Sequence, residues 1–265
     1  MPGQVSTAWW LDVATAVRAS FLVEGRGVGV VCSFGLRYGC RIMHALRDNR
    51  LPSIRRLRFL AVGFFVAAAL AMLVDMPIAR LTAAGKVPGD LRRLIAFSEI
   101  FAHGMGVLMI LLAMHVLAPA RRPEILRLTC TAFGAGLLAV LLKFIVARTR
   151  PRATNLDVHV LDTFEAWLPL FNESVVSIDS SIQAMPSGHA ATAVGLAIGL
   201  VKIFPHGRYF FVGLAVLAAA QRIDSSAHFL SDTLAGAGIG CLVAATMQDV
   251  RGLGARFDRW EKRVQ

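Results

Sequence analysis

Long runs of apolar residues constrain the fold of this 265-residue chain more than any other feature. Residues 59–77 hold a single charge, Asp75, residues 128–142 hold none, and residues 229–247 hold only Asp232. Apolar runs of about 18 residues or more can cross a hydrocarbon core roughly 30 Å thick. Only 17% of all residues are charged, against roughly 25% in soluble domains. The sequence therefore predicts a helical membrane protein and excludes secreted, disordered and purely soluble classes.

Hydropathy divides the chain into six expected membrane spans and two flanks. The spans are expected at about 59–78, 94–118, 125–147, 187–204, 208–222 and 228–247. The predicted fold class is all-α, a polytopic bundle of about six transmembrane helices with an N-terminal amphipathic segment. We expect an interfacial or cytoplasmic segment at 1–57, a membrane core at 58–248 and a basic cytoplasmic tail at 249–265.

The N-terminal segment contains an apolar stripe. Trp10, Val13, Val17 and Phe21 recur at helical spacing, which predicts an amphipathic helix in the membrane interface. Simple packing of this segment on the bundle is an equal alternative. A cleaved signal peptide is not expected, because no charged region followed by an apolar core opens the chain.

The net charge of +11 indicates membrane topology rather than nucleic-acid binding. Most of the 28 basic residues lie between apolar runs, in segments 1–58, 119–127, 202–208 and 251–263. These flanks are expected on the cytoplasmic side, near anionic lipid headgroups. The sequence therefore predicts a multi-pass protein of a bacterial inner membrane, with both termini cytoplasmic and the loop 148–186 facing outward. The sequence has no basic motif with interleaved aromatic residues, which is the pattern that favours a nucleic-acid partner.

Polar residues gather at the outward ends of the expected spans, where each is a functional candidate. His228 and Asp232 are four residues apart, so they share a helix face, and the carboxylate is expected to orient the imidazole. Ser187, Gly188 and His189 open a helix, where free backbone N–H groups favour an anion.

Three cations complete a predicted pocket for a phosphoryl group: Lys143, Arg150 and Arg222. Two histidines beside such a pocket allow one to attack phosphorus while the other protonates the leaving oxygen. No cluster of Asp and Glu suited to magnesium accompanies them in the sequence. These residues predict metal-independent phosphoryl transfer with no cofactor. The four cysteines, Cys32, Cys40, Cys130 and Cys241, show no metal-binding spacing and are interpreted as structural.

The order of these residues resembles a known three-part signature. Lys143-x6-Arg150-Pro151, then Pro186-Ser187-Gly188-His189, then Arg222-x5-His228-x3-Asp232 is similar to the motifs of the type 2 phosphatidic-acid phosphatase superfamily. The resemblance covers about residues 59–247.

The resemblance implies a six-helix membrane core and a covalent phosphohistidine mechanism. It assigns His228 as nucleophile, Asp232 as its orienting partner and His189 as general acid. It also assigns phosphate binding to five residues: Lys143, Arg150, Ser187, Gly188 and Arg222. One departure from the family pattern is Gln221, where a Ser usually precedes the third-motif Arg; the Gln can still donate a hydrogen bond.

The expected function is a lipid phosphate phosphatase acting on a lipid phosphomonoester or diphosphate. Isoprenoid diphosphates, phosphatidate or phosphatidylglycerophosphate, and lipid A phosphates all fit as substrates. Two alternatives remain: a phosphotransferase using the same phosphohistidine, and a non-catalytic protein that binds or translocates lipid phosphates. The expected partners are the lipid substrate and the surrounding membrane lipids.

Four further polar residues receive structural interpretations. Glu99 and His103 are four apart near the outer end of the second span, where an interhelical hydrogen bond is favoured over lining the substrate pocket. Arg148 is interpreted as a flanking charge and Asp75 as the end of its span.

Overall fold

The computed structural model describes residues 53–85, 88–168 and 180–264. These residues belong to one compact unit, 49–265, and the other unit, 1–48, lies outside the described part of the chain. The expected amphipathic stripe of the N-terminal segment therefore also lies outside the described residues.

The described part is mostly helical. Its α-helices, in chain order, are α3 (Ile54–Ala71), α4 (Asp75–Ala83), α5 (Gly89–Phe97), α6 (Gly104–Leu117), α7 (Arg122–Leu142), α8 (Gly188–Ile203), α9 (Arg208–Asp224), α10 (Leu230–Gln248) and α11 (Leu253–Val264). The short 3-10 helix η1 (Ser98–Phe101) joins α5 to the turn before α6.

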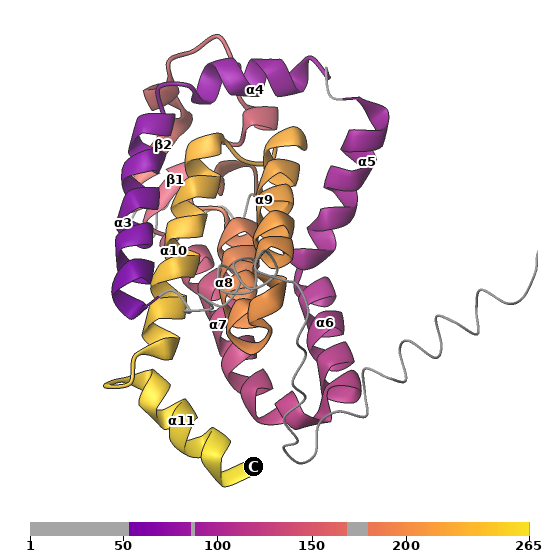
Figure 1. Ribbon diagram of the computed structural model, residues 1–265. Helices are drawn as coiled ribbons and strands as arrows, with labels where there is room; N and C mark the ends of the chain where they lie inside the picture. Colours follow the sequence, from indigo (N-terminus) through magenta and orange to yellow (C-terminus); the bar gives the residue numbers. More distant parts are fainter. Residues whose placement is uncertain (1–52, 86–87, 169–179, 265) are drawn as a thin grey trace, which may run out of the picture. The chain divides into compact units, whose positions relative to one another are not determined.

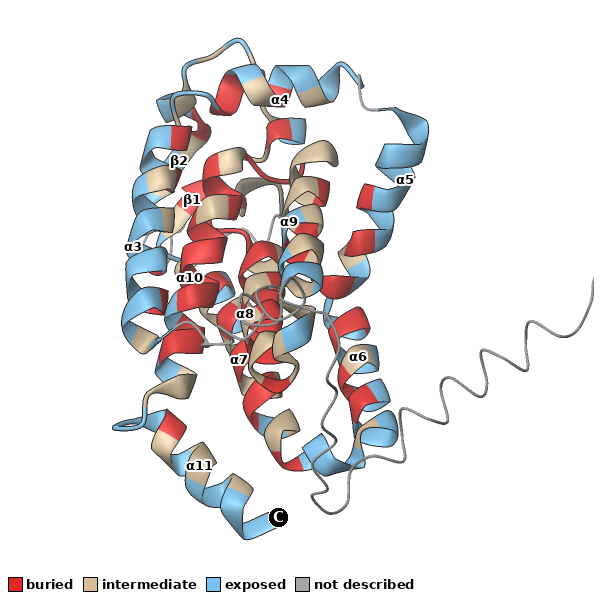
Figure 2. Cartoon of the chain, viewed as in Figure 1, coloured by how far each residue is buried: buried red, intermediate tan, exposed pale blue. Residues whose placement is uncertain are grey.

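Helices α8 and α10 form the centre of the bundle. Helix α10 packs against α3, α7 and α8, and α8 packs against α7 and α9. Both central helices consist largely of buried small residues, whereas α3 and α6 present exposed Phe, Leu, Met and Val side chains (Figure 2). Such an apolar outer surface is unusual for a protein in water and matches a lipid environment.

Only two helices are individually long and apolar enough to cross a membrane, Pro119–Leu142 and Leu230–Gln248, among the residues described. Two further spans are possible if each bent helix pair is counted once. The pair α3–α4 bends by 75° and the pair α5–η1–α6 by 68°. Helices occupy most of the expected spans at 59–78 and 94–118, but a bend interrupts each of them.

Local chemistry explains both breaks. Pro77 lies in the first turn of α4 and has no N–H to continue a helix from α3, so the chain turns at residues 72–74 and restarts at Asp75. At the second break, the His103 side chain accepts a hydrogen bond from the Met105 N–H and caps α6. A Cβ at Gly106 would lie 2.0 Å from the carbonyl oxygen of Ile100, so this turn requires glycine.

The long loop after α7 contains the only strands of the described residues, which the all-α prediction missed. Strand β1 (Val146–Arg148) pairs antiparallel with β2 (Phe164–Trp167), with Ala147 opposite Ala166. The strands lie near the end of the bundle crossed by α4, and α11 lies at the other end (Figure 1). The β1 strand leads directly to Arg150, so the hairpin helps to place one of the predicted phosphate-binding residues.

The C-terminal tail, expected as a basic flank, contains a helix. Helix α11 is held to the start of α7 by Arg127, which pairs with Asp258 and Glu261. Arg127 is almost fully buried there.

Candidate active site

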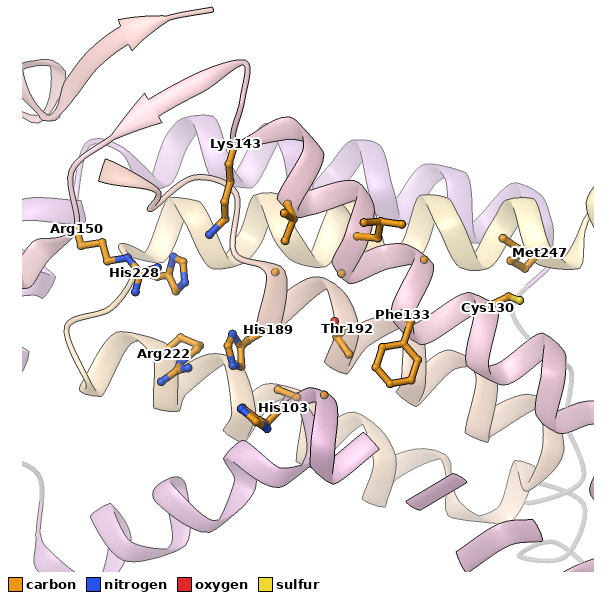
Figure 3. Close-up of a pocket in the computed structure, with 17 residues that line it drawn as sticks. His103, Cys130, Phe133, Lys143, Arg150, His189, Thr192, Arg222, His228 and Met247 are labelled. Atoms are coloured by element: carbon orange, nitrogen blue, oxygen red, sulfur yellow. The ribbon is translucent and has the colours of Figure 1, made fainter. Parts of the chain in front are cut away.

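A pocket of about 880 Å³ lies between α7, α8 and the turn that precedes α6. Figure 3 shows its basic and imidazole side chains gathered at one end, with Phe133, Cys130 and Met247 toward the other. Six of the eight predicted site residues line it: Lys143, Arg150, Gly188, His189, Arg222 and His228. The structure thus brings together residues from three separate segments of the chain.

Lys143 precedes β1 in the chain and Arg150 follows it, and both residues line the pocket. Lys143 is the C-cap of α7, and its Nζ donates a hydrogen bond to the carbonyl oxygen of Gln183 at 2.7 Å. Burial, and then the nearby charge of Arg150, lower the pKa of Lys143 to about 8, while Asp232 opposes this shift. The Arg150 backbone N–H donates to the Ser181 carbonyl oxygen at 2.8 Å, which fixes the chain where it leaves the strand.

The N-terminus of α8 supplies Gly188 and His189 to the pocket. Ser187 is the N-cap residue, and its hydroxyl accepts a hydrogen bond from the Ala190 N–H. Ser187 is fully buried and does not line the pocket. Its side chain therefore caps the helix in this structure, which differs from the phosphate contact that the resemblance implied.

Helix α10 approaches the start of α8 closely enough to lock its position. The Ser187 N–H donates to the Asp232 carbonyl oxygen at 3.0 Å. A Cβ on Gly236 would lie 2.3 Å from the carbonyl oxygen of Ser187. Glycine at 236 is thus required for the contact that places His189 beside His228.

The ring of His228 is oriented by a backbone carbonyl. Its Nδ1 lies 2.6 Å from the carbonyl oxygen of Ala184, and because that oxygen only accepts, Nδ1 carries the proton. In the neutral ring, Nε2 therefore holds the free lone pair. Burial lowers the pKa of His228 below its usual value, although Asp232 opposes this shift, so the neutral form is favoured at neutral pH.

Asp232 is farther from His228 than the i,i+4 spacing predicted. The distance between His228 Nδ1 and Asp232 Oδ2 is 3.8 Å, which is too long for a hydrogen bond. Asp232 instead accepts from the Phe229 N–H at 2.8 Å and from Arg148 Nη1 at 2.6 Å. The structure therefore places Asp232 behind the pocket, where it anchors the start of α10 and contributes charge rather than a direct bond.

Arg148 is a buried neighbour of the site whose contacts the sequence did not predict. It is completely buried and pairs with Asp75 at 2.9 Å as well as with Asp232. Its guanidinium carbon lies 4.8 Å from the centroid of the Phe164 ring and 4.2 Å from that of the Phe229 ring. The interpretation of Arg148 as a flanking charge is wrong.

Asp75 belongs to the same buried cluster and does more than end a span. It accepts hydrogen bonds from the Ser231 N–H and hydroxyl, and so joins the first turn of α4 to the first turn of α10. The sequence held one signal of this pairing, a lone carboxylate in a long apolar run. A buried charge is costly unless it is paired.

Arg222 reaches the pocket from the last turn of α9. Its Nη1 pairs with Glu99 at 3.2 Å, and its Nη2 donates to the Ser225 hydroxyl at 3.3 Å. The predicted interhelical hydrogen bond of Glu99 is thus present, with an α9 residue as partner. His103 lines the pocket, with its ring centroid 6.0 Å from that of His189.

The remainder of the pocket is apolar and follows α7 toward the opposite end of the bundle. Cys130, Phe133, Leu137 and Val140 recur along one face of α7 and line it, and Met247 contributes from α10. From Lys143 to Cys130 the helix rises about 20 Å. A cavity with a cationic end and an apolar body fits an amphiphile with an anionic head. Among the described residues, no group of three His, Cys, Asp or Glu side chains could hold a metal ion.

The chain is similar in sequence to one protein family and to named phosphatases. The family model for the PAP2 superfamily matches residues 124–252. Lipid A 1-phosphatase of Rhizobium johnstonii is 31% identical over 110 residues, which are 42% of this chain and 41% of that protein. Decaprenylphosphoryl-5-phosphoribose phosphatase of Mycobacterium tuberculosis is 31% identical over 167 residues, which are 62% of this chain and 82% of that protein.

A solved structure shares the fold. The crystal structure of the transmembrane PAP2 type phosphatidylglycerolphosphate phosphatase from Bacillus subtilis aligns with a TM-score of 0.50 at 17% identity. The alignment covers 78% of this chain and 98% of that chain. By contrast, this chain spans only 41% of the length of the Rhizobium johnstonii lipid A 1-phosphatase.

Proposed function

Because the chain belongs to the PAP2 superfamily, we propose that it is a membrane lipid phosphate phosphatase. It hydrolyses a lipid phosphomonoester or diphosphate through a phosphohistidine on His228, without a metal ion. The observation that carries this proposal is the pocket itself. Its cationic end holds both histidines, and its apolar body continues along α7.

In the first step, Nε2 of His228 attacks phosphorus with its lone pair, and the bond from phosphorus to the leaving oxygen breaks. The Nδ1–H bond to Ala184 stabilises the imidazolium character that develops on the ring. His189 donates a proton to the leaving oxygen. Lys143, Arg150 and Arg222 stabilise the charge on the remaining phosphoryl oxygens, together with the backbone N–H groups at the start of α8.

In the second step, water attacks the phosphohistidine. His189, which lost its proton in the first step, accepts one from this water, and the bond between phosphorus and Nε2 breaks. Inorganic phosphate leaves, and both histidines return to their starting states.

The proposed topology has six membrane crossings. The bent pairs α3–α4 and α5–η1–α6 make two of them, and α7, α8, α9 and α10 make the others. The excess of Lys and Arg in the flanks supports cytoplasmic termini, with the active site on the outer side of a bacterial inner membrane.

The relatives support a lipid substrate without selecting its headgroup. One is named for lipid A and another for a decaprenyl-linked phosphoribose. We therefore propose the class of lipid phosphates, with lipid A phosphates, isoprenoid phosphates and diphosphates, and phosphatidate or phosphatidylglycerophosphate as the panel to compare.

Phosphate release by detergent-purified protein tests the proposal. Each lipid of the panel is incubated with wild type and with His228→Ala, both with EDTA present. We expect release that persists in EDTA and is absent in the variant. Phosphorylated acceptor without matching phosphate release would identify a transferase instead. Folded wild-type protein that binds these lipids without turnover would identify a binding or translocating protein.

A further inference from the structure

The break between α5 and α6 brings an acidic residue to the edge of the phosphate site. Glu99 lies on η1, two residues after α5 ends, and η1 packs against α9. The turn that follows carries His103 into the pocket. This segment belongs to none of the three motifs on which the proposed mechanism depends.

The Glu99 carboxylate makes two polar contacts with adjacent residues of α9. Its Oε1 pairs with Arg222 Nη1 at 3.2 Å, and its Oε2 accepts from Gln221 Nε2 at 3.1 Å. Both oxygens are thereby used. The carboxylate is held at two points and cannot rotate away from Arg222 without losing a bond.

These contacts restrict how Arg222 can lie. The side chain has four rotatable bonds, and Glu99 and Ser225 hold its two terminal nitrogens. Its Nε is buried and has no hydrogen-bond partner within the described part of the chain.

Gln221 explains how the carboxylate is fixed. It is buried, and its amide points to Glu99 rather than to the pocket lining. A serine, which the resemblance leads one to expect here, is two bonds shorter and lacks the reach of this amide. The Gln221 side chain thus takes part in a second layer of contacts around the phosphate site.

We propose that Glu99 is a positioning residue that fixes Arg222 for phosphate binding, with Gln221 locking the Glu99 carboxylate. This inference rests on the proposed function, because it assigns Arg222 to the phosphoryl group. Glu99 acts through Arg222 and does not touch the substrate.

The test compares Glu99→Ala, Glu99→Gln and Gln221→Ser in the full chain. Arg92→Ala is the matched control, because Arg92 joins α5 to α9 through Asp224 at 3.1 Å and does not line the pocket. The first readout is the rise in Tm that inorganic phosphate produces, which requires no turnover. The second is kcat and KM for a lipid phosphate.

We expect Glu99→Ala to weaken phosphate binding and lower kcat/KM by about 10- to 100-fold, the cost of a misplaced binding group. Glu99→Gln retains an acceptor for Arg222 and keeps most of the affinity, since the Gln221 amide can turn its free oxygen toward the new N–H2. Gln221→Ser falls between these two. Arg92→Ala stays within about twofold of wild type.

A double variant separates positioning from general destabilisation. If Glu99 acts only through Arg222, adding Glu99→Ala to Arg222→Ala causes no further loss of phosphate binding. Additive losses would overturn the proposal, as would phosphate binding by Glu99→Ala that equals or exceeds that of wild type. Absence of any phosphate effect on wild type would also overturn it. Phosphate binding with the expected variant pattern but no hydrolysis of any lipid would refute the proposed hydrolase alone.

Discussion

The Nδ1 atom of His228 donates a hydrogen bond to the backbone carbonyl of Ala184 at 2.6 Å. Ala184 lies just before the start of α8, so the segment that carries His189 also orients His228. This bond fixes the tautomer that leaves Nε2 free to act as nucleophile. The acceptor belongs to the main chain, so a substitution of Ala184 leaves it in place, and only a change at His228 removes the donor.

The first prediction concerns Asp232→Asn. Where a carboxylate directly orients a catalytic histidine, its amide replacement costs about 10⁴-fold in kcat. Here the acceptor that orients the ring is a backbone carbonyl. We therefore expect the kcat of Asp232→Asn to lie less than about 100-fold below that of wild type. Steady-state kcat for wild type, Asp232→Asn and His228→Ala checks it. A loss in Asp232→Asn as large as that in His228→Ala would show that the carboxylate orients the ring after all.

The buried cluster of Asp75, Arg148 and Asp232 leads to a prediction on stability. Arg148→Met leaves two carboxylates buried without their cation. Removing one partner of a buried ion pair costs about 3–5 kcal/mol, so the free energy of unfolding should fall by about this amount. Thermal unfolding in detergent measures it, with the exposed Arg152→Met as control. Equal Tm values for the two variants would contradict the structural role assigned to the cluster.

The sequence predicted the helices of the bundle but not the two breaks within them. Helical periodicity and hydropathy identified helices in all six expected ranges, because an apolar run in a membrane favours a helix wherever it lies. The breaks were missed because each depends on a single local feature inside an apolar run, Pro77 in one case and the His103 cap with Gly106 in the other.

For the site, motif order indicated which residues gather in the pocket but not which neighbour each one contacts. The i,i+4 spacing predicted a bond between His228 and Asp232, yet tertiary partners compete for both groups. Ala184 takes the imidazole and Arg148 takes the carboxylate. Such competition depends on residues more than 40 positions away, which local spacing does not contain.

Lys143 gives a prediction on pH. Its pKa of about 8 means that it is charged below this pH and neutral above it. Since only the charged form attracts a phosphoryl group, kcat/KM for the free enzyme should fall as pH rises through about 8. Arginine stays charged throughout this range, so Lys143→Arg should shift the alkaline limb to higher pH.

The comparison uses full pH profiles of kcat/KM, each normalised to its own plateau. The acid limb serves as the internal control, because protonation of His228, whose pKa is lowered by burial, should affect both proteins alike. An alkaline limb that stays at the same pH in Lys143→Arg would assign that limb to another group.

The apolar body of the pocket predicts a dependence on chain length. Leu137→Trp places a bulky ring in the part lined by α7 and should lower kcat/KM for long-chain lipid phosphates by about tenfold. A short-chain analogue that ends before this position should lose less. Leu141→Trp is the control, since Leu141 is similarly exposed on α7 but does not line the pocket. Equal effects on long and short chains would remove this part of the pocket from substrate binding.

The most direct test of the account is detection of the covalent intermediate. Purified protein is mixed with a lipid phosphate carrying a labelled phosphoryl group, quenched in alkali within one turnover, and mapped by peptide mass spectrometry. The account predicts an acid-labile, alkali-stable phosphoryl group on His228 that is absent from His228→Ala and forms in the presence of EDTA. Turnover with no labelled histidine under any quench time, or with label on a residue other than His228, would contradict it.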